Sequence, residues 1–265
     1  DSRVAERVSS SHKLLASSYI RVCDWKAASH HIESALEVYP SDVRILGLKT
    51  TVAGLNGSDE EFRSVLADFM AIPAAERDGS EGSTVRNLPA VYRVIPSDEL
   101  LREIRRSIAS IESRSNATEL LRYAVVNARA CLALEGFTDD YGELREGILA
   151  QGFPDLEMVL LPGISSLAGL VDDADAEFER MIAGAVKSGQ LLNEVSLRYD
   201  FVAHLIRHAK GETVIARSIA QGRRVATKVG IGGVGAKYDR LEAENVNRRE
   251  RTAGLTKREL EVLQL

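Results

Sequence analysis

The stretch Ser9–Asp42, SSSHKLLASSYIRVCDWKAASHHIESALEVYPSD, decides the fold of this chain. Its apolar residues recur at helical spacing on both sides of a short turn, which predicts a hairpin of two amphipathic helices. Small Ala16, Ala28 and Ala35 lie where the two helix backbones must approach closely, and Pro40 ends the second helix. Larger side chains supply the bulk around these contacts: Leu15, Tyr19, Trp25, Ile32 and Leu36.

Over its full length this stretch resembles a tetratricopeptide (TPR) repeat, a helical hairpin of about 34 residues. Asp24-Trp25 stands at the turn, where the family usually has Asp-Tyr. One such hairpin cannot bury its own apolar face, so the resemblance implies that similar hairpins stack behind it.

The rest of the chain continues this pattern. Residues 58–73 carry a second hairpin's buried face at i, i+3, i+4, i+7 and i+8, and Pro73 follows Pro40 by one repeat length. The second helices of successive hairpins are expected to end near residues 40, 73, 112, 154, 189 and 230. The predicted fold class is therefore all-α: a TPR-like α-solenoid of about six helical hairpins.

Three segments fit this pattern less well. Residues 43–56 form a weaker predicted helix, because they contain Gly47 and Gly54. Residues 74–88 are polar and rich in Gly and Ser, which predicts a mobile insertion or a poorly formed repeat. Residues 155–171 are expected to form a helix bent at Pro162.

Composition limits the classes of protein. No run of about 18 apolar residues occurs, which argues against a membrane span, and the polar opening residues 1–8 are unlike a signal peptide. The lack of an initiator Met indicates a processed or excised piece. Cys23 and Cys131 are far apart in helical patterns, which favours buried reduced thiols in a cytoplasmic protein. A net charge of -5 means that the bulk of the chain is not expected to bind nucleic acid.

The C-terminal stretch 255–263, LTKRELEVL, begins a further predicted helix. Thr256 and Glu259 form a capping box. The stretch resembles the opening of the helix-turn-helix domain of LuxR-type transcriptional regulators, in which the pattern L-T-x-R-E-x-E-V-L starts the first helix. Lys257 stands where that family more often has Pro. The residues on which we place this helix-turn-helix start are Leu255, Thr256, Arg258, Glu259, Val262 and Leu263.

The two resemblances together imply a domain order. Residues 1–245 would form a TPR-like sensor or interaction domain, 246–254 a charged linker, and 255–265 the first helix of a truncated helix-turn-helix. DNA would be read only by the missing part of that domain. The family resemblance also implies a bacterial protein and a possible homodimer, and some large members carry an ATPase module before the sensor region.

A candidate binding face lies on the first repeat. In TPR proteins the first helix of each pair lines the concave groove where partners bind. Lys13, Ser17 and Arg21 share one face of that helix at i, i+4 and i+8, and Arg44 extends it from the second repeat. A cationic stripe suits a carboxylate, a phosphate or an acidic peptide. The alternative is a solvated helix face with ordinary surface charges.

Other motifs predict no chemistry. Residues 230–235 fit G-x-G-x-x-G, but no βαβ unit follows, so a glycine-rich turn between helices is the better interpretation. His204 and His208 have i, i+4 spacing without an obvious third metal ligand, and we expect a partly exposed pair near a helix end. We find no catalytic constellation, and we expect no enzyme activity, metal or cofactor.

Two functional hypotheses remain. The first is the regulatory domain of a LuxR-type regulator, which binds a small effector or a partner protein and biases an attached DNA-binding domain. The second is a TPR scaffold that binds an acidic peptide or a partner protein, in which case the terminal motif is accidental.

Overall fold

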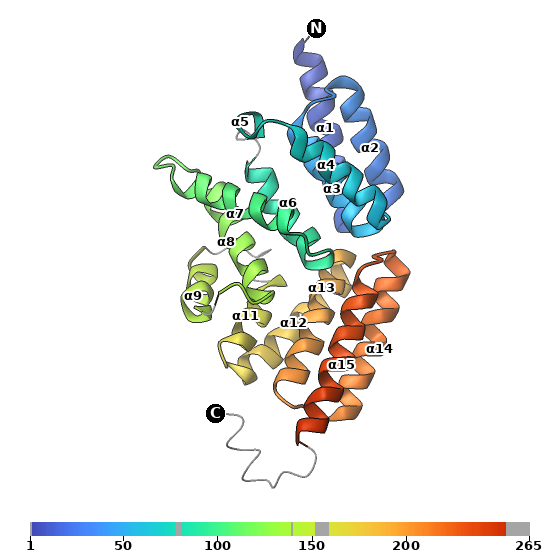
Figure 1. The fold of residues 1–265 in the computed structure, drawn as a ribbon, viewed down its shortest axis with the longest axis vertical. Helices are drawn as coiled ribbons and strands as arrows, with labels where there is room; N and C mark the ends of the chain where they lie inside the picture. The colour runs from blue at the N-terminus through green and yellow to red at the C-terminus, as the bar shows by residue number, and fades with distance from the viewer. Residues whose placement is uncertain (1, 78–80, 139, 152–158, 253–265) are drawn as a thin grey trace.

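The structure is a computed structural model that describes residues 2–77, 81–138, 140–151 and 159–252, and within these ranges every regular element is a helix (Figure 1). The all-α prediction is confirmed. The helices follow one another as α1 (Ser2–Arg21), α2 (Trp25–Val38), α3 (Val43–Asn56), α4 (Asp59–Ala71), α5 (Ala74–Arg77), α6 (Glu81–Val94), α7 (Asp98–Glu112), α8 (Glu119–Leu134), α9 (Tyr141–Gln151), α11 (Leu161–Leu167), α12 (Val171–Ser188), α13 (Leu191–Arg207), α14 (Glu212–Val229) and α15 (Val234–Thr252).

The N-terminal hairpin forms as its sequence predicts. Asp24 caps α2, because its carboxylate accepts a hydrogen bond from the Ala27 N–H at 3.0 Å. Ala16, Ala28 and Ala35 are fully buried where α1 and α2 pack against each other. Small side chains allow this close approach of the two backbones.

The ends of the second helices agree with the predicted spacing. Gly189 and Gly230 have positive φ (68° and 74°), so each ends its helix in the left-handed conformation that glycine adopts readily. The other four ends lie within a few residues of the expected positions, at Val38, Ala71, Glu112 and Gln151. The solenoid itself stays a prediction.

Of the two alternatives for residues 74–88, the mobile insertion is wrong for the described part, 74–77 and 81–88, and the poorly formed repeat stays a prediction. They include α5 and the first part of α6, which packs against α3, α7 and α8. Val85, Leu88 and Val91 of α6 are fully buried in the largest apolar cluster of the described chain. This helix was not predicted from the sequence, because its first turn is polar and it contains Pro89.

Helix α3 was expected to be weak, yet most of its residues are buried. Its glycine marks a close contact: a Cβ on Gly54 would lie 2.3 Å from Val91 Cγ1 of α6. The absence of a Cβ at Gly54 therefore permits this close contact between α3 and α6, although glycine has a low helix propensity. Pro162 is also placed differently from the prediction, because it lies in the first turn of α11 and does not bend a longer helix.

The chain closes on itself. In Figure 1 it runs from α1–α4 at one end through α6–α9 to α11–α13; α14 then extends back toward the N-terminal helices, and α15 runs away from them again beside α14. Trp25 Nε1 donates a hydrogen bond to the Val229 carbonyl at 2.6 Å, across 204 residues of sequence. Gly230 lies beside Asn56 and Trp25, so the turn after α14 rests on the first two hairpins.

A buried group of charges, here called the junction cluster, joins the two halves of the chain. It consists of Arg93 on α6, Glu135 after α8, Asp200 on α13 and Lys237 on α15. Glu135 Oε1 accepts from Arg93 Nε at 3.2 Å and from Lys237 Nζ at 2.9 Å, and Arg93 also pairs with Asp200.

The junction cluster has uneven electrostatics. Burial raises the pKa of Asp200 although Arg93 opposes it. Burial also acts to raise the pKa of Glu135, but Arg93 and Lys237 outweigh it and the pKa is lowered. The second oxygen of Asp200 and the Tyr238 hydroxyl are buried without a hydrogen-bond partner in the described chain. The cluster therefore depends on all four charges remaining together.

Candidate functional site

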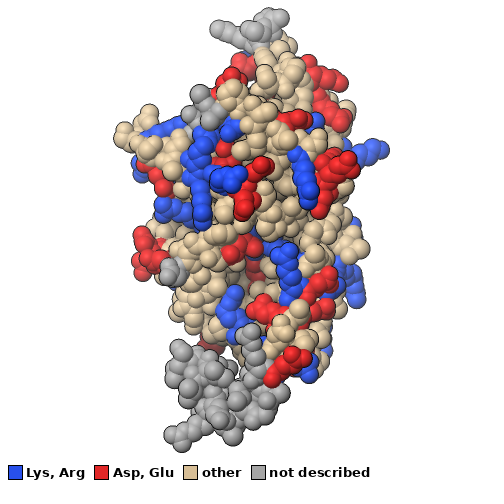
Figure 2. Space-filling view, viewed as in Figure 1, with Lys and Arg blue, Asp and Glu red and all other residues tan. Residues whose placement is uncertain are grey.

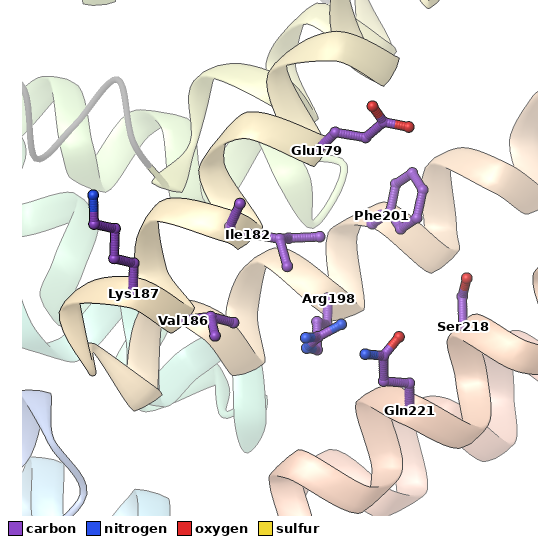
Figure 3. Close-up of a pocket in the computed structure, with 9 residues that line it drawn as sticks. Glu179, Ile182, Val186, Lys187, Arg198, Phe201, Ser218 and Gln221 are labelled. Atoms are coloured by element: carbon purple, nitrogen blue, oxygen red, sulfur yellow. The ribbon is translucent and has the colours of Figure 1, made fainter.

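A groove of about 490 Å³ lies between α12, α13 and α14 (Figure 3). Helix α12 buries one face against α13 through Phe178, Met181 and Ala185. The neighbouring strip of α12 is left to form one wall, and Val186 in it is 52% exposed. The groove is lined by Glu179, Ile182, Ala183, Val186, Lys187, Arg198, Phe201, Ser218 and Gln221.

The groove has an apolar wall and one held cation. Arg198 Nε donates to Glu194 Oε1, one helical turn earlier, at 2.7 Å. Both side chains are largely buried, at 12% and 9% exposure, so the ion pair fixes the guanidinium. In Figure 3 this guanidinium lies between the apolar side chains of α12 and the Gln221 amide of α14. The arrangement can bind a ligand that is apolar along one side and accepts hydrogen bonds on the other.

Helix α14, which supplies Ser218 and Gln221 to the groove, also holds α15. Arg223 pairs with Asp239 at 2.7 Å and with Glu242 at 2.5 Å. We call these contacts, together with those of Glu212 described next, the α14–α15 seam. The seam joins the last described helix to a helix that lines the groove.

Glu212 forms the far end of the α14–α15 seam. Its carboxylate accepts from Asn245 Nδ2 and from Arg248 Nη2, each at 3.0 Å. The predicted linker 246–254 is therefore helical as far as Thr252 and bound to α14 through Arg248. Residues 246, 247, 249 and 250 are exposed, as expected of a linker, but the stretch continues a helix, which was not expected.

Of the predicted binding residues, Lys13 and Arg44 lie close together. Burial lowers the pKa of Lys13, and the charges of Arg44 and Arg86 lower it further. Arg44 is held by Asp42, with Nε–Oδ1 at 3.1 Å and Nη2–Oδ2 at 2.9 Å. Helices α1, α3 and α6 thus each contribute one cation to a common region.

The other two predicted residues contribute less to this region. Ser17 is half-buried on α1, and Arg21 is the exposed last residue of that helix, about 12 Å along its axis from Lys13. Sequence reasoning missed Arg86, because it lies in the segment that was taken as an insertion. We call Lys13, Arg44 and Arg86 the cationic face.

The predicted helix-turn-helix start lies outside the described residues. Its members are Leu255, Thr256, Arg258, Glu259, Val262 and Leu263. Over the face drawn in Figure 2, Lys and Arg are interspersed with Asp and Glu, so no charge of a single sign covers it.

The sequence predicts that His204 is partly exposed, but in the structure it is completely buried. Its Nε2 lies 2.9 Å from Asp175 Oδ1 and its Nδ1 lies 2.8 Å from Ser166 Oγ. Arg207 donates to the same hydroxyl at 2.8 Å, and His208 Nε2 lies 3.2 Å from the Ser166 carbonyl. Burial lowers the pKa of both His204 and His208, which favours neutral imidazoles.

The hydrogen-bonded series of serine, histidine and aspartate side chains, here Ser166, His204 and Asp175, also occurs in hydrolases that use a serine nucleophile. Here, however, Ser166 is 1% exposed and does not line the groove. The network satisfies polar groups buried between α11, α12 and α13, which would otherwise be costly to bury. Spacing alone could not reveal it, because the three residues come from three helices.

A second cavity of about 340 Å³ lies between α7, α8 and α9. Arg105 stacks over the Phe137 ring at 5.1 Å, and Arg129 pairs with Glu112 at its edge. Its cations are thus already engaged by the chain's own groups. The groove beside α14 remains the better candidate, because its wall also contacts α15.

Several remaining predictions concern absent features. Residues 230–233 form the turn between α14 and α15, as expected, and Val234 and Gly235 already belong to α15. Among the residues that the structure places, no three His, Cys, Asp or Glu side chains are arranged to hold a metal ion. No helix within the described ranges is both long and apolar enough to span a membrane. No protein-family model matches this chain, and comparison with curated proteins and with solved structures finds no match.

Proposed function

We propose that this chain is the effector-binding region of a LuxR-type transcriptional regulator. An effector binds in the groove between α12, α13 and α14, and it biases a DNA-binding domain that follows α15. The observation that carries the proposal is the double role of α14, which lines the groove through Ser218 and Gln221 and holds α15 through Arg223 and Glu212.

The energetics of the α14–α15 seam suit a switch. Its ion pairs are partly exposed, and such pairs are worth only about 0–1 kcal/mol each. A small rotation of α14 can therefore exchange one arrangement of the seam for another. Coupling requires only that the effector bind these arrangements with different affinity. The resemblance of residues 255–263 to a helix-turn-helix start supports DNA as the output.

The test uses the full-length protein encoded by the native gene. Effectors are first found by thermal stabilisation with a metabolite panel, in which a ligand at 100 times its Kd adds about 2.7 kcal/mol. DNA affinity for the gene's own upstream region is then measured with and without each effector. Val186→Trp fills the groove and is expected to abolish the effector's influence on DNA binding.

The matched control is Val214→Trp, because Val214 is similarly exposed on α14 and does not line the groove. This variant should respond to effector as the unsubstituted protein does. The proposal fails if the gene encodes no helix-turn-helix after Leu265, or if Val186→Trp leaves the effector response intact.

The cationic face favours a second candidate function, an acidic-peptide scaffold. Lys13, Arg44 and Arg86 converge from three helices, and the one acid among them, Asp42, pairs with Arg44 and also acts on the charge of Lys13. Binding of acidic peptides should then fall at least tenfold in Lys13→Glu with Arg86→Glu, and should weaken with added salt. If these peptides bind the double variant equally well, the scaffold function is excluded.

A further inference from the structure

We infer that the groove between α12, α13 and α14 binds a small amphipathic monocarboxylate, with its carboxylate on Arg198 and its hydrocarbon part along α12. This inference rests on the proposed function, since it names the class of effector for the same groove. Three properties of the groove lead to it: the size of its lining, its apolar wall and its balance of charge.

The size of the groove favours a small molecule. About 490 Å³ lies within the range of about 300–1,000 Å³ that small-molecule sites occupy. A protein partner usually contacts about 20–30 residues on each side. Nine residues line the groove, which is too few for such an interface.

The α12 wall can bind hydrocarbon. Ile182, Ala183 and Val186 form it, and Phe201 of α13 lines the groove next to it. Phe201 is itself held against Phe178, with ring centroids 5.3 Å apart, so this part of the groove is fixed before a ligand arrives. Covering exposed apolar surface stabilises a complex by roughly 25 cal/mol per Å². The half-exposed Val186 is the side chain that would gain most.

The polar side of the groove selects an anion. Arg198 is the cation on this side, whereas Lys187, which also lines the groove, extends from α12 away from Arg198 in Figure 3, and Glu179 is the one acid of the lining. Glu194 binds only Nε of Arg198, and the other two guanidinium nitrogens form no hydrogen bond or ion pair with the residues that the structure describes. The remaining nitrogens can thus donate to a carboxylate in the paired geometry that guanidinium favours.

The same charges limit the ligand to a single negative charge. Glu194 already neutralises part of the Arg198 charge, and Glu179 at the rim would repel a dianion such as a phosphate monoester. Ser218 and Gln221 offer neutral hydrogen bonds, which suit a carboxylate or an adjacent hydroxyl or amide of the ligand. A monocarboxylate with an apolar tail meets each of these conditions.

Calorimetric titration of the chain with octanoate, octan-1-ol and octylamine tests the ligand class. These probes share one tail and differ in the charge of the head group. Octanoate should bind at least tenfold more tightly than either of the others. Val186→Trp should abolish octanoate binding, and Arg198→Gln should weaken it at least tenfold.

The controls separate a groove effect from a general one. Arg217→Gln removes an exposed cation from α14 outside the groove and should leave octanoate binding unchanged. Arg198→Gln leaves Glu194 unpaired and can destabilise the fold, so the probe series on the unsubstituted chain and Val186→Trp provide tests that do not depend on it.

The outcomes distinguish the ligand class from the proposed function. Equal affinity for octanoate and octan-1-ol, or octanoate binding that survives Val186→Trp, overturns the monocarboxylate. If another effector then regulates DNA binding through Val186, the proposed function still holds. If octanoate binds as expected and DNA affinity does not respond to any groove ligand, the ligand class is supported and the regulatory function fails.

Discussion

The N-terminal hairpin and the junction cluster hold helices together in opposite ways. In the hairpin, α1 and α2 meet through fully buried alanines, close in sequence. In the junction cluster, four buried charges join helices from both halves, and Arg93 and Asp200 are 107 residues apart. The first contact is stabilised by local apolar burial, whereas the second exists only when the whole chain has closed. Substitutions should therefore act differently in the two regions.

The largest effect is expected in the junction cluster. Asp200→Ala removes one of the two acidic partners of the buried Arg93 guanidinium and leaves Glu135 as the other, and breaking a buried pair costs about 3–5 kcal/mol. The free energy of unfolding, measured in urea, should fall by this amount. Asp239→Ala removes an exposed acid paired with Arg223 and should cost at most about 1 kcal/mol. Equal losses for the two variants would show that the junction cluster does not hold the halves together.

A smaller effect is expected in the hairpin. Ala28→Leu forces a larger side chain between α1 and α2, and overpacking a core typically costs about 1–3 kcal/mol. Urea unfolding measures this loss as well. Ala243→Leu on the exposed side of α15 is the control and should change stability by less than about 0.5 kcal/mol. A fully tolerated Ala28→Leu would mean that the two helices do not approach as closely as described.

The buried histidine adds a pH dependence that the hairpin alanines lack. Burial lowers the pKa of His204, so the unfolded chain takes up the proton first as pH falls. The stability that neutral His204 provides is thus present above about pH 6.5 and is lost as pH falls toward the folded-state pKa. Unfolding measured from pH 7 to 5 should depend less on pH in His204→Gln.

Asp175, Lys210 and Arg207 face this imidazole and keep their charges in that variant. His208 also faces it, and because burial lowers its pKa too, it accounts for the pH dependence that remains. His30→Gln, on an exposed residue of α2, is the control and should keep the full pH dependence. If the stability of His204→Gln depends on pH as that of the unsubstituted protein does, protonation of His204 is not the cause of the stability loss at acid pH.

The smallest effect on stability is expected in the α14–α15 seam. Glu212→Gln weakens the ion pairs to Arg248 and Arg249, which are partly exposed, so global stability should fall by less than about 1 kcal/mol. Hydrogen exchange over residues 245–250 should nevertheless become faster, while exchange in α1 and α2 stays the same. Unchanged exchange near Arg248 would mean that Glu212 does not hold the end of α15.

Local signals explain how much of the fold the sequence predicted. Pro40, Gly189 and Gly230 act through their own backbone, so the helix ends near them could be placed. Helix α6 was missed, because its apolar residues follow a polar turn and its partners lie on α3 and α8. Gly54 was expected only to weaken its helix, because its close contact with Val91 of another helix cannot be seen in the sequence.

The candidate sites show the same limit. Lys13 and Arg44 could be grouped from repeat spacing, but Arg86 could not, because its helix was not recognised. The groove has no motif, since three helices each contribute a few ordinary side chains to it. Arg198 and Glu194 are an i, i+4 pair that resembles many surface pairs, and only the packing of α12 and α14 shows that it is buried.

The link between the groove and α15 can be tested most directly by hydrogen exchange on the full-length protein. Exchange of the α15 amides is compared with and without a saturating effector, in the unsubstituted protein and in Val186→Trp. Effector binding should change protection in α14 and α15 of the unsubstituted protein and should leave Val186→Trp unaffected. An effector that occupies the groove and leaves α15 exchange unchanged would contradict the proposed coupling.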